Sequence, residues 1–86
     1  MNVVKPFVFD VIRSQGLEVS SGRANFLLVK PRNCAAAVDY LRDAGILVRS
    51  MSAPALRGTF RVSMGTMDEM ENFVDVLKSY MKVERR

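Results

Sequence analysis

Histidine is absent from this 86-residue sequence, and cysteine occurs only once, as Cys34. A lone cysteine excludes an internal disulfide, and these residue types cannot build a Cys/His metal site. They also exclude the Ser–His and Cys–His pairs of nucleophilic catalysis. Cys34 precedes three alanines, and we expect it to pack as a small apolar side chain. From the residue types alone we therefore predict no catalytic residue and no metal ligand.

Long apolar runs are absent as well, and none approaches the roughly 18 residues that a membrane span needs. Pro6 and Asp10 interrupt any apolar core that an N-terminal signal peptide would require. We therefore expect no membrane partner and a cytoplasmic location. The hydrophobic and charged fractions, 49% and 26%, are ordinary for a globular protein. A chain of this length can bury only one thin core, which predicts one small domain.

Apolar periodicity predicts three helices, over residues 6–14, 34–44 and 67–82. Asn33 is a favourable N-cap for the second helix, and a glycine follows each of the first two. The third helix has the strongest periodic signal in the sequence. Thr66 and Glu69 stand at its start with the spacing of a capping box, in which each side chain bonds the other's backbone amide.

Extended segments are predicted between these helices, over residues 17–20, 24–30, 46–49 and 59–64. The segment over 24–30 contains four consecutive apolar residues without alternation, which indicates an interior strand covered on both faces, at least in the complete protein. The order of elements is helix, strand, strand, helix, strand, strand, helix. This order predicts an α+β fold in which a small, largely antiparallel sheet has helices packed on one face.

Two arginines stand out in the last two predicted strands. In the segment over 59–64 polar and apolar residues alternate, so Arg61 must lie on the face away from the helices. Arg49 ends the preceding strand and alternates with Ile46 and Val48 in the same way. Paired strands lie about 4.8 Å apart, so both guanidinium groups could converge on one carboxylate or phosphate. The formal net charge of +4 agrees with an anionic partner. Two solvated strand arginines would give the same pattern, and alternation alone leaves both interpretations open.

Other motifs are weaker. The segment over 57–62 begins with a basic residue and a glycine, as does a strand signature of RNA-recognition domains. Thr59, Arg61 and Met64 stand where stacking aromatic side chains should stand, so the aromatic platform is missing. The acidic residues at 68, 69 and 71 are expected to interact with a helix N-terminus and not to form an acid–base pair. We therefore expect no nucleic-acid partner.

Four segments resemble the C-terminal small domain of the histidinol-phosphate aminotransferases, which are fold-type I, pyridoxal-phosphate-dependent enzymes. They cover residues 16–19, 24–29, 41–49 and 60–70. The pattern ANF-x-L-V, the pattern G-I-L-V-R and the strand-to-helix turn R-V-S-x-G-T occur in the family's order and spacing. The three patterns together, in this order and spacing, carry the resemblance. The resemblance covers roughly residues 14–80.

This resemblance implies roles for the same two arginines. In the family, the arginine of R-V-S-x-G-T binds the anionic group of the substrate, and it matches Arg61. The arginine that ends the preceding strand helps to hold the phosphate of histidinol phosphate, and it matches Arg49. The implied partner is a small phosphorylated amine or amino-acid substrate, and decarboxylating relatives that act on phosphorylated threonine share similar motifs. The full-length enzymes are expected to be homodimers that use pyridoxal phosphate.

The sequence departs from the family where the catalytic half should be. The lysine that forms the internal aldimine, in its Ser-x-x-Lys context, has no match here. We therefore expect residues 16–86 to be a small substrate-binding domain and residues 1–15 to be a remnant of the inter-domain connection. Such a fragment should bind no cofactor, should be inactive alone and should self-associate through its uncovered face. The alternative from another functional class is a free-standing α+β module that binds a small anion or regulatory ligand.

Overall fold

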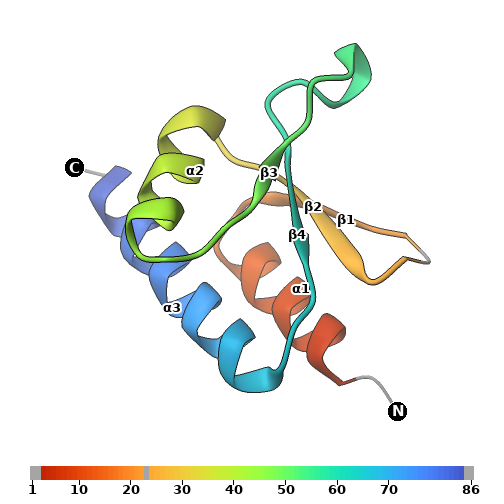
Figure 1. Cartoon of the computed structure of the whole chain (residues 1–86), viewed down its shortest axis with the longest axis vertical. Coiled ribbons are helices and arrows are strands. Elements are labelled where there is room, and N and C mark those ends of the chain that lie inside the picture. Colours follow the sequence, from red (N-terminus) through yellow and green to blue (C-terminus); the bar gives the residue numbers. More distant parts are fainter. Residues whose placement is uncertain (1–2, 23, 85–86) are drawn as a thin grey trace.

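The structure, a computed structural model, describes residues 3–22 and 24–84 (Figure 1). Its elements, in chain order, are α1 (Val4–Ser14), β1 (Glu18–Ser21), β2 (Phe26–Lys30), α2 (Cys34–Asp43), β3 (Arg49–Ser50), the 3₁₀ helix η1 (Pro54–Leu56), β4 (Phe60–Ser63) and α3 (Met67–Glu84). The outermost residues of the predicted segments 1–15 and 16–86 lie outside the described part. No helix of the described part combines the length and the apolar character that crossing a membrane would require.

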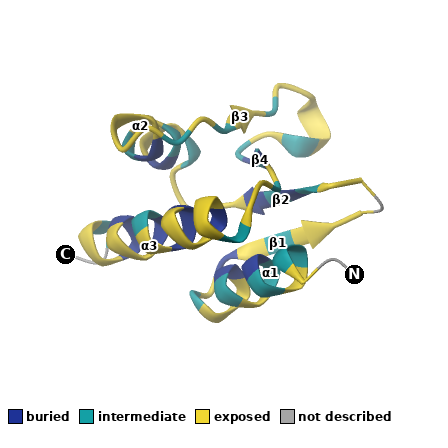
Figure 2. Cartoon of the chain, turned by 60° about the horizontal axis from the view of Figure 1, so that its bottom comes forward, coloured by how far each residue is buried: buried dark blue, intermediate teal, exposed yellow. Residues whose placement is uncertain are grey.

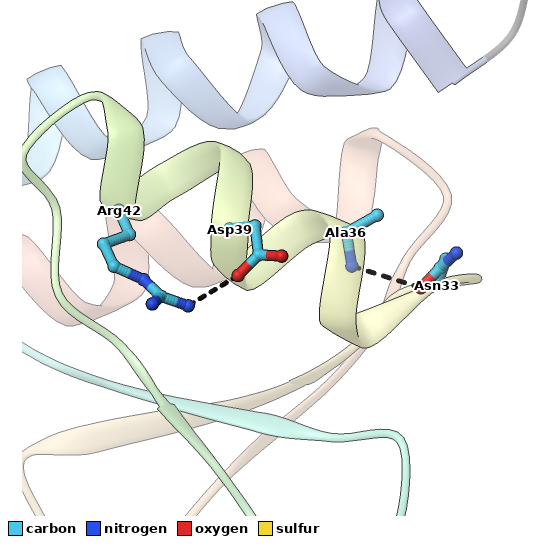
Figure 3. A network of polar contacts seen from close by, with 4 residues as sticks. All are labelled: Asn33, Ala36, Asp39 and Arg42. Carbon is cyan, nitrogen blue, oxygen red and sulfur yellow. Dashed lines mark hydrogen bonds and ion pairs between the residues drawn. The ribbon is translucent and has the colours of Figure 1, made fainter.

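The helix boundaries follow the local signals of the sequence. The side-chain oxygen of Asn33 accepts a hydrogen bond of 3.1 Å from the amide of Ala36, so Asn33 is the N-cap of α2 (Figure 3). Along the same helix, Arg42 donates to the carboxylate of Asp39 on the exposed side. Gly45 follows the helix with φ of +84°, a left-handed conformation that side chains with a Cβ adopt only at a cost. The predicted start of α2 is therefore confirmed, and the helix ends at Asp43, one residue before the predicted end.

The strands of the described part form one antiparallel sheet in the order β1-β2-β4-β3. β2 and β4 are the central strands, and Leu27 is paired with Val62 and Val29 with Phe60. These four side chains are buried on the same face. The predicted α+β fold with a small antiparallel sheet is confirmed.

One apolar core joins that face of the sheet to all three helices. α3 contacts both α1 and α2, while α1 also contacts β1 and β2. Buried and exposed segments alternate along α3, as expected for a helix with one face in the core (Figure 2). The largest fully buried side chains are Phe60, Phe73, Ile12, Leu27, Leu41, Leu77, Val8 and Val29. Because α1 supplies Val8 and Ile12, it is part of the same core as the sheet.

The strand predicted over residues 46–49 is wrong in extent, because the ladder contains only Arg49 and Ser50. The amide of Ile46 donates to the carbonyl of Leu41 at 2.9 Å, so the chain is still bonded to the end of α2 at this point. That bond takes the amide of Ile46, and residues 46–48 lie outside the sheet. Leu47 is consequently 83% exposed.

β2, which is predicted to be covered on both faces in the complete protein, is covered fully on only one face by the described chain. β2 is interior by position, with β1 and β4 as neighbours. Leu27 and Val29 are buried, whereas Phe26 and Leu28 on the other face are only half-buried. The uninterrupted apolar run therefore reflects one complete contact with the helices and a second apolar strip that the described chain covers in part.

The capping box at the start of α3 is confirmed by both of its hydrogen bonds. The amide of Thr66 donates to Oε1 of Glu69 at 2.9 Å, and the amide of Glu69 donates to Oγ1 of Thr66 at 3.2 Å. A Cβ on Gly65 would lie 2.7 Å from that same carboxylate oxygen. A larger residue at position 65 would therefore displace the Glu69 side chain from the amide that it accepts from.

We predict that the Glu69→Gln variant loses an acid-dependent part of the folding stability. In the wild type, hydrogen bonds from the backbone and the side chain of Thr66 to the Glu69 carboxyl lower its pKa in the folded state. A carboxyl whose pKa is lower in the folded than in the unfolded state contributes to the free energy of unfolding. The contribution is complete above the unfolded-state pKa, about 4.3, and is lost as the pH falls through the folded-state pKa. Urea denaturation between neutral and acidic pH should therefore show the variant less stable than wild type at pH 7 and equal to it in strong acid. Glu71→Gln, an exposed change on the same helix, is the control, and an equal pH profile for both variants would contradict the prediction.

Candidate functional site

The face of the sheet that the helices do not cover, here called the open face, is defined by the strand register. Successive residues of a strand point to opposite faces, so the paired residues that alternate with the buried set share the other face. This open face comprises Glu18, Ser20, Phe26, Leu28, Lys30, Arg49, Arg61 and Ser63. One row runs across all four strands, from Ser20 through Leu28 and Arg61 to Arg49.

Arg49 and Arg61 are direct cross-strand partners in the antiparallel pair β3–β4. Directly opposed residues of such a pair have Cα atoms about 4.5–5.5 Å apart and their side chains on one face. Arg49 is exposed and Arg61 is half-buried. Among the described residues neither arginine forms an ion pair with a carboxylate. Two neighbouring like charges without a counter-charge are unfavourable in a sheet, and an anion bound between them would relieve that repulsion.

Phe26 is the one residue with a specific contact to Arg61 in the described chain. The guanidinium carbon of Arg61 lies 5.3 Å from the centroid of the Phe26 ring, within the range of a cation–π interaction. Phe26 is paired with Ser63, one same-face position along the ladder from Leu28 and Arg61. Sequence reasoning missed this residue, because only the register between β2 and β4 places it beside the arginine.

A small cavity lies on the open face beside the row that runs from Ser20 to Arg49. It has a volume of about 200 Å³, and its lining residues are Glu18, Ser20, Leu28, Lys30, Ala55, Leu56 and Thr59. Ala55 and Leu56 belong to η1, and Thr59, which follows η1 and lines the same cavity, is only 8% exposed. The face predicted to be free of covering elements is thus partly covered at this end.

The lysines of this chain do not fit the pyridoxal phosphate site that the resemblance to the aminotransferases implies. An amine that forms an imine with the cofactor must be unpaired and enclosed in a pocket. Lys30, Lys78 and Lys82 are exposed. The ammonium of Lys5 donates to the carbonyls of Gly22, at 2.6 Å, and of Ala24. Lys5 is therefore engaged with backbone carbonyls, and none of the four lysines is both unpaired and enclosed.

Cys34 lies at the first turn of α2 and is half-buried. Burial raises the pKa of its thiol, and a smaller opposing effect comes from Ser50. A raised pKa disfavours the thiolate, which is the nucleophilic and metal-binding form. The described residues also contain no cluster of acidic, cysteine or histidine side chains able to hold a metal ion. The arginine pair is therefore the arrangement with the clearest binding chemistry in the described chain.

Comparisons with known proteins point to one family. The sequence model of the aminotransferase class I and II family matches residues 6–77. A histidinol-phosphate aminotransferase from Chromohalobacter salexigens is 36% identical over 70 residues, which are 79% of this chain and 20% of that protein. The histidinol-phosphate aminotransferase of Hyphomonas neptunium is 32% identical over 74 residues, 83% of this chain and 20% of that protein.

Solved structures agree with this assignment. A Burkholderia pseudomallei protein assigned as an aminotransferase superimposes with a TM-score of 0.84 at 28% identity, covering 91% of this chain and 24% of that one. An L-threonine-O-3-phosphate decarboxylase from Porphyromonas gingivalis shares the fold, with a TM-score of 0.73 at 19% identity over 92% of this chain and 27% of that one. The chain spans about one fifth of the length of the curated relatives that it matches. Because the family match extends over most of its length, this chain belongs to the class I and II aminotransferases.

Proposed function

We propose that this chain is the small, substrate-binding domain of an aminotransferase of the histidinol-phosphate type, placed at the C-terminal end of the complete enzyme. The observation that carries the proposal is the direct opposition of Arg49 and Arg61 on the open face, without a carboxylate partner in the described chain. In this proposal residues 16–86 form the domain, and residues 1–15, whose helix α1 packs against the domain's core, connect it to a large domain. The substrate class is a small phosphorylated amine or amino acid.

Phosphate suits this pair of cations for electrostatic and geometric reasons. A guanidinium presents its N–H donors as a planar fork, which matches two oxygens of a phosphate or carboxylate. A phosphate monoester carries close to two negative charges at neutral pH, so one group can neutralise both arginines. Arg61 is half-buried beside Phe26, which makes it the more strongly positioned partner, whereas Arg49 is exposed at the edge strand.

The catalytic contribution of the complete enzyme is proposed to lie in a large domain. Pyridoxal phosphate supplies the electron sink of transamination when it is bound. No lysine of this chain is placed to hold it, so this chain alone is expected to be inactive and its residues are expected to contribute substrate binding only. We further propose a cytoplasmic, homodimeric complete enzyme. Phe26 and Leu28 give the open face an apolar strip, which is expected to favour self-association of the isolated chain.

A free-standing anion-binding module is the second candidate, and the compactness of the chain favours it. The Cα radius of gyration is 12.0 Å, which agrees with the value of about 12 Å expected for a folded domain of this length. The chain also has its own contiguous core from helices and sheet. Such a domain can fold without a large partner, as a free-standing module must.

A grafting experiment separates the two candidates. The aligned segment of the Chromohalobacter salexigens enzyme would be replaced by the matching residues of this chain, and transamination of histidinol phosphate with 2-oxoglutarate would be measured. The proposal predicts an active graft whose activity falls sharply when Arg61→Ala is introduced. Bound pyridoxal phosphate, measured by absorbance, reports whether each graft is assembled. A graft that holds the cofactor but has equal turnover and KM with and without Arg61 would contradict the proposal.

A further inference from the structure

The contact between Phe26 and Arg61 joins two residues from neighbouring strands of the open face. In the β2–β4 register Arg61 is opposite Leu28, and Phe26 is the next residue of β2 on that face. The guanidinium carbon of Arg61 is 5.3 Å from the ring centroid. Phe26 and Arg61 are both half-buried, so water is partly excluded from the contact and the attraction is strengthened.

No ion pair within the described chain holds the guanidinium of Arg61. Its direct partner across the other edge of β4 is Arg49, which repels it. Among the described residues of the open face, only Glu18 carries a carboxylate. It belongs to β1, where it is opposite Lys30 in the strand register. Without the ring, Arg61 would be a long side chain with several rotamers, which an anion would have to order on binding.

An aromatic ring orients a guanidinium differently from a carboxylate. A carboxylate accepts hydrogen bonds from the N–H groups and so competes with any incoming anion for them. A phenyl ring attracts the cation through its π-electrons and takes no conventional donor. Phe26 can therefore fix the position of Arg61 and leave its five N–H donors available to a ligand.

We infer that Phe26 is a positioning residue for anion binding by Arg61, holding the guanidinium over its ring in an orientation ready for a phosphate or carboxylate. This inference rests on the proposed function of Arg61. In this inference Phe26 acts on the ligand only through Arg61. The inference thus gives an aromatic side chain of the open face a role in binding.

The test is a titration of the 86-residue chain with inorganic phosphate at constant ionic strength, followed by NMR at the side-chain Nε–Hε resonance of Arg61. We expect Phe26→Leu to weaken phosphate binding at least two- to fivefold, because this half-buried cation–π contact should be no weaker than an exposed one. It should also remove the ring-current shift of the Arg61 resonance in the free protein. Phe26→Tyr, which keeps the ring, should restore both the affinity and the shift.

Phe9→Leu is the matched control, because Phe9 is also a half-buried phenylalanine but belongs to α1. It should leave the affinity and the Arg61 resonance unchanged, and amide spectra of every variant report folding. Phosphate affinity and an Arg61 resonance that are the same in Phe26→Leu and wild type would overturn the inference while leaving the role of Arg61 intact. Phosphate binding that does not change on Arg61→Ala would overturn the proposed function, and the inference with it.

Discussion

Replacing Arg61 with alanine is expected to weaken phosphate binding by the 86-residue chain about tenfold or more. Hydrogen bonds to charged groups contribute roughly 1.5–3 kcal/mol each, and every 1.4 kcal/mol corresponds to a factor of ten in affinity. The half-buried position of Arg61 beside Phe26 places its contribution above that of a freely solvated side chain. Isothermal calorimetry or NMR titration with phosphate would measure the difference.

Two variants control for charge alone. Arg61→Lys keeps the positive charge but loses the planar fork, and it should recover only part of the affinity. Arg13→Ala lowers the net charge as much as Arg61→Ala does, but it changes an exposed residue of α1 instead of one on the open face. If Arg13→Ala weakened phosphate binding as strongly as Arg61→Ala, non-specific attraction to a basic protein would explain the result and the arginine site would be refuted.

Arg49→Ala should have the smaller effect of the two arginine changes, because Arg49 is exposed and has no aromatic contact in the described chain. The double variant is informative beyond the single ones. If one phosphate contacts both guanidinium groups, the two losses should not add, since residues that share a ligand are energetically coupled. This coupling distinguishes a shared anion from two independent weak sites.

The local rules of the sequence predicted the helices well. Asn33, Gly45 and the pair Thr66–Glu69 each satisfy backbone groups within a few residues, so their effect depends little on the rest of the fold. The apolar period over residues 67–82 likewise predicted α3, whose buried face also includes Tyr80. That residue is buried, and desolvation together with nearby Glu84 raises the pKa of its hydroxyl to about 12.

The strands were less predictable because their limits depend on contacts distant in sequence. β3 shrinks to two residues since the amide of Ile46 remains bonded to Leu41 at the end of α2. A period-2 pattern contains no information about such a competing bond. The same limit applies to the candidate site. Alternation placed Arg61 on the open face, but the contact with Phe26 depends on the register between β2 and β4, which no local pattern encodes.

The strand-to-helix turn connects the candidate site to the stability of the fold. β4 ends at Ser63, only two residues after Arg61, and α3 begins at Met67. The capping box of Thr66 and Glu69 fixes the first turn of α3, and Gly65 leaves the room that the Glu69 carboxylate needs. Because α3 is anchored in the core, this short turn fixes the end of β4 and thereby the position from which Arg61 projects. The R-V-S-x-G-T pattern thus contains both the arginine on the open face of the sheet and the N-terminal cap of the helix that packs against the opposite face.

Phe73→Ala is expected to have the largest effect on folding, a loss of about 3–5 kcal/mol of unfolding free energy. Phe73 is fully buried in the middle of α3, the helix that contacts both α1 and α2. Removing its ring deletes apolar contacts and leaves a cavity that rigid neighbours fill only in part. Domains of this length are stable by roughly 4–13 kcal/mol, so the change removes a large fraction of the total.

Thermal and urea denaturation followed by circular dichroism would measure this loss, with an expected fall in Tm of about 15 °C or more. Phe73→Leu, which keeps most of the apolar volume, should fold and show a much smaller loss, so the effect can be quantified even if the alanine variant is unfolded at room temperature. Val83→Ala removes apolar atoms from the same helix at a side chain that is 54% exposed, and it should change stability by no more than about 0.5 kcal/mol. Equal losses for Phe73→Ala and Val83→Ala would mean that α3 is not packed in the core as described, and the support that it gives to β4 and Arg61 would then fail as well.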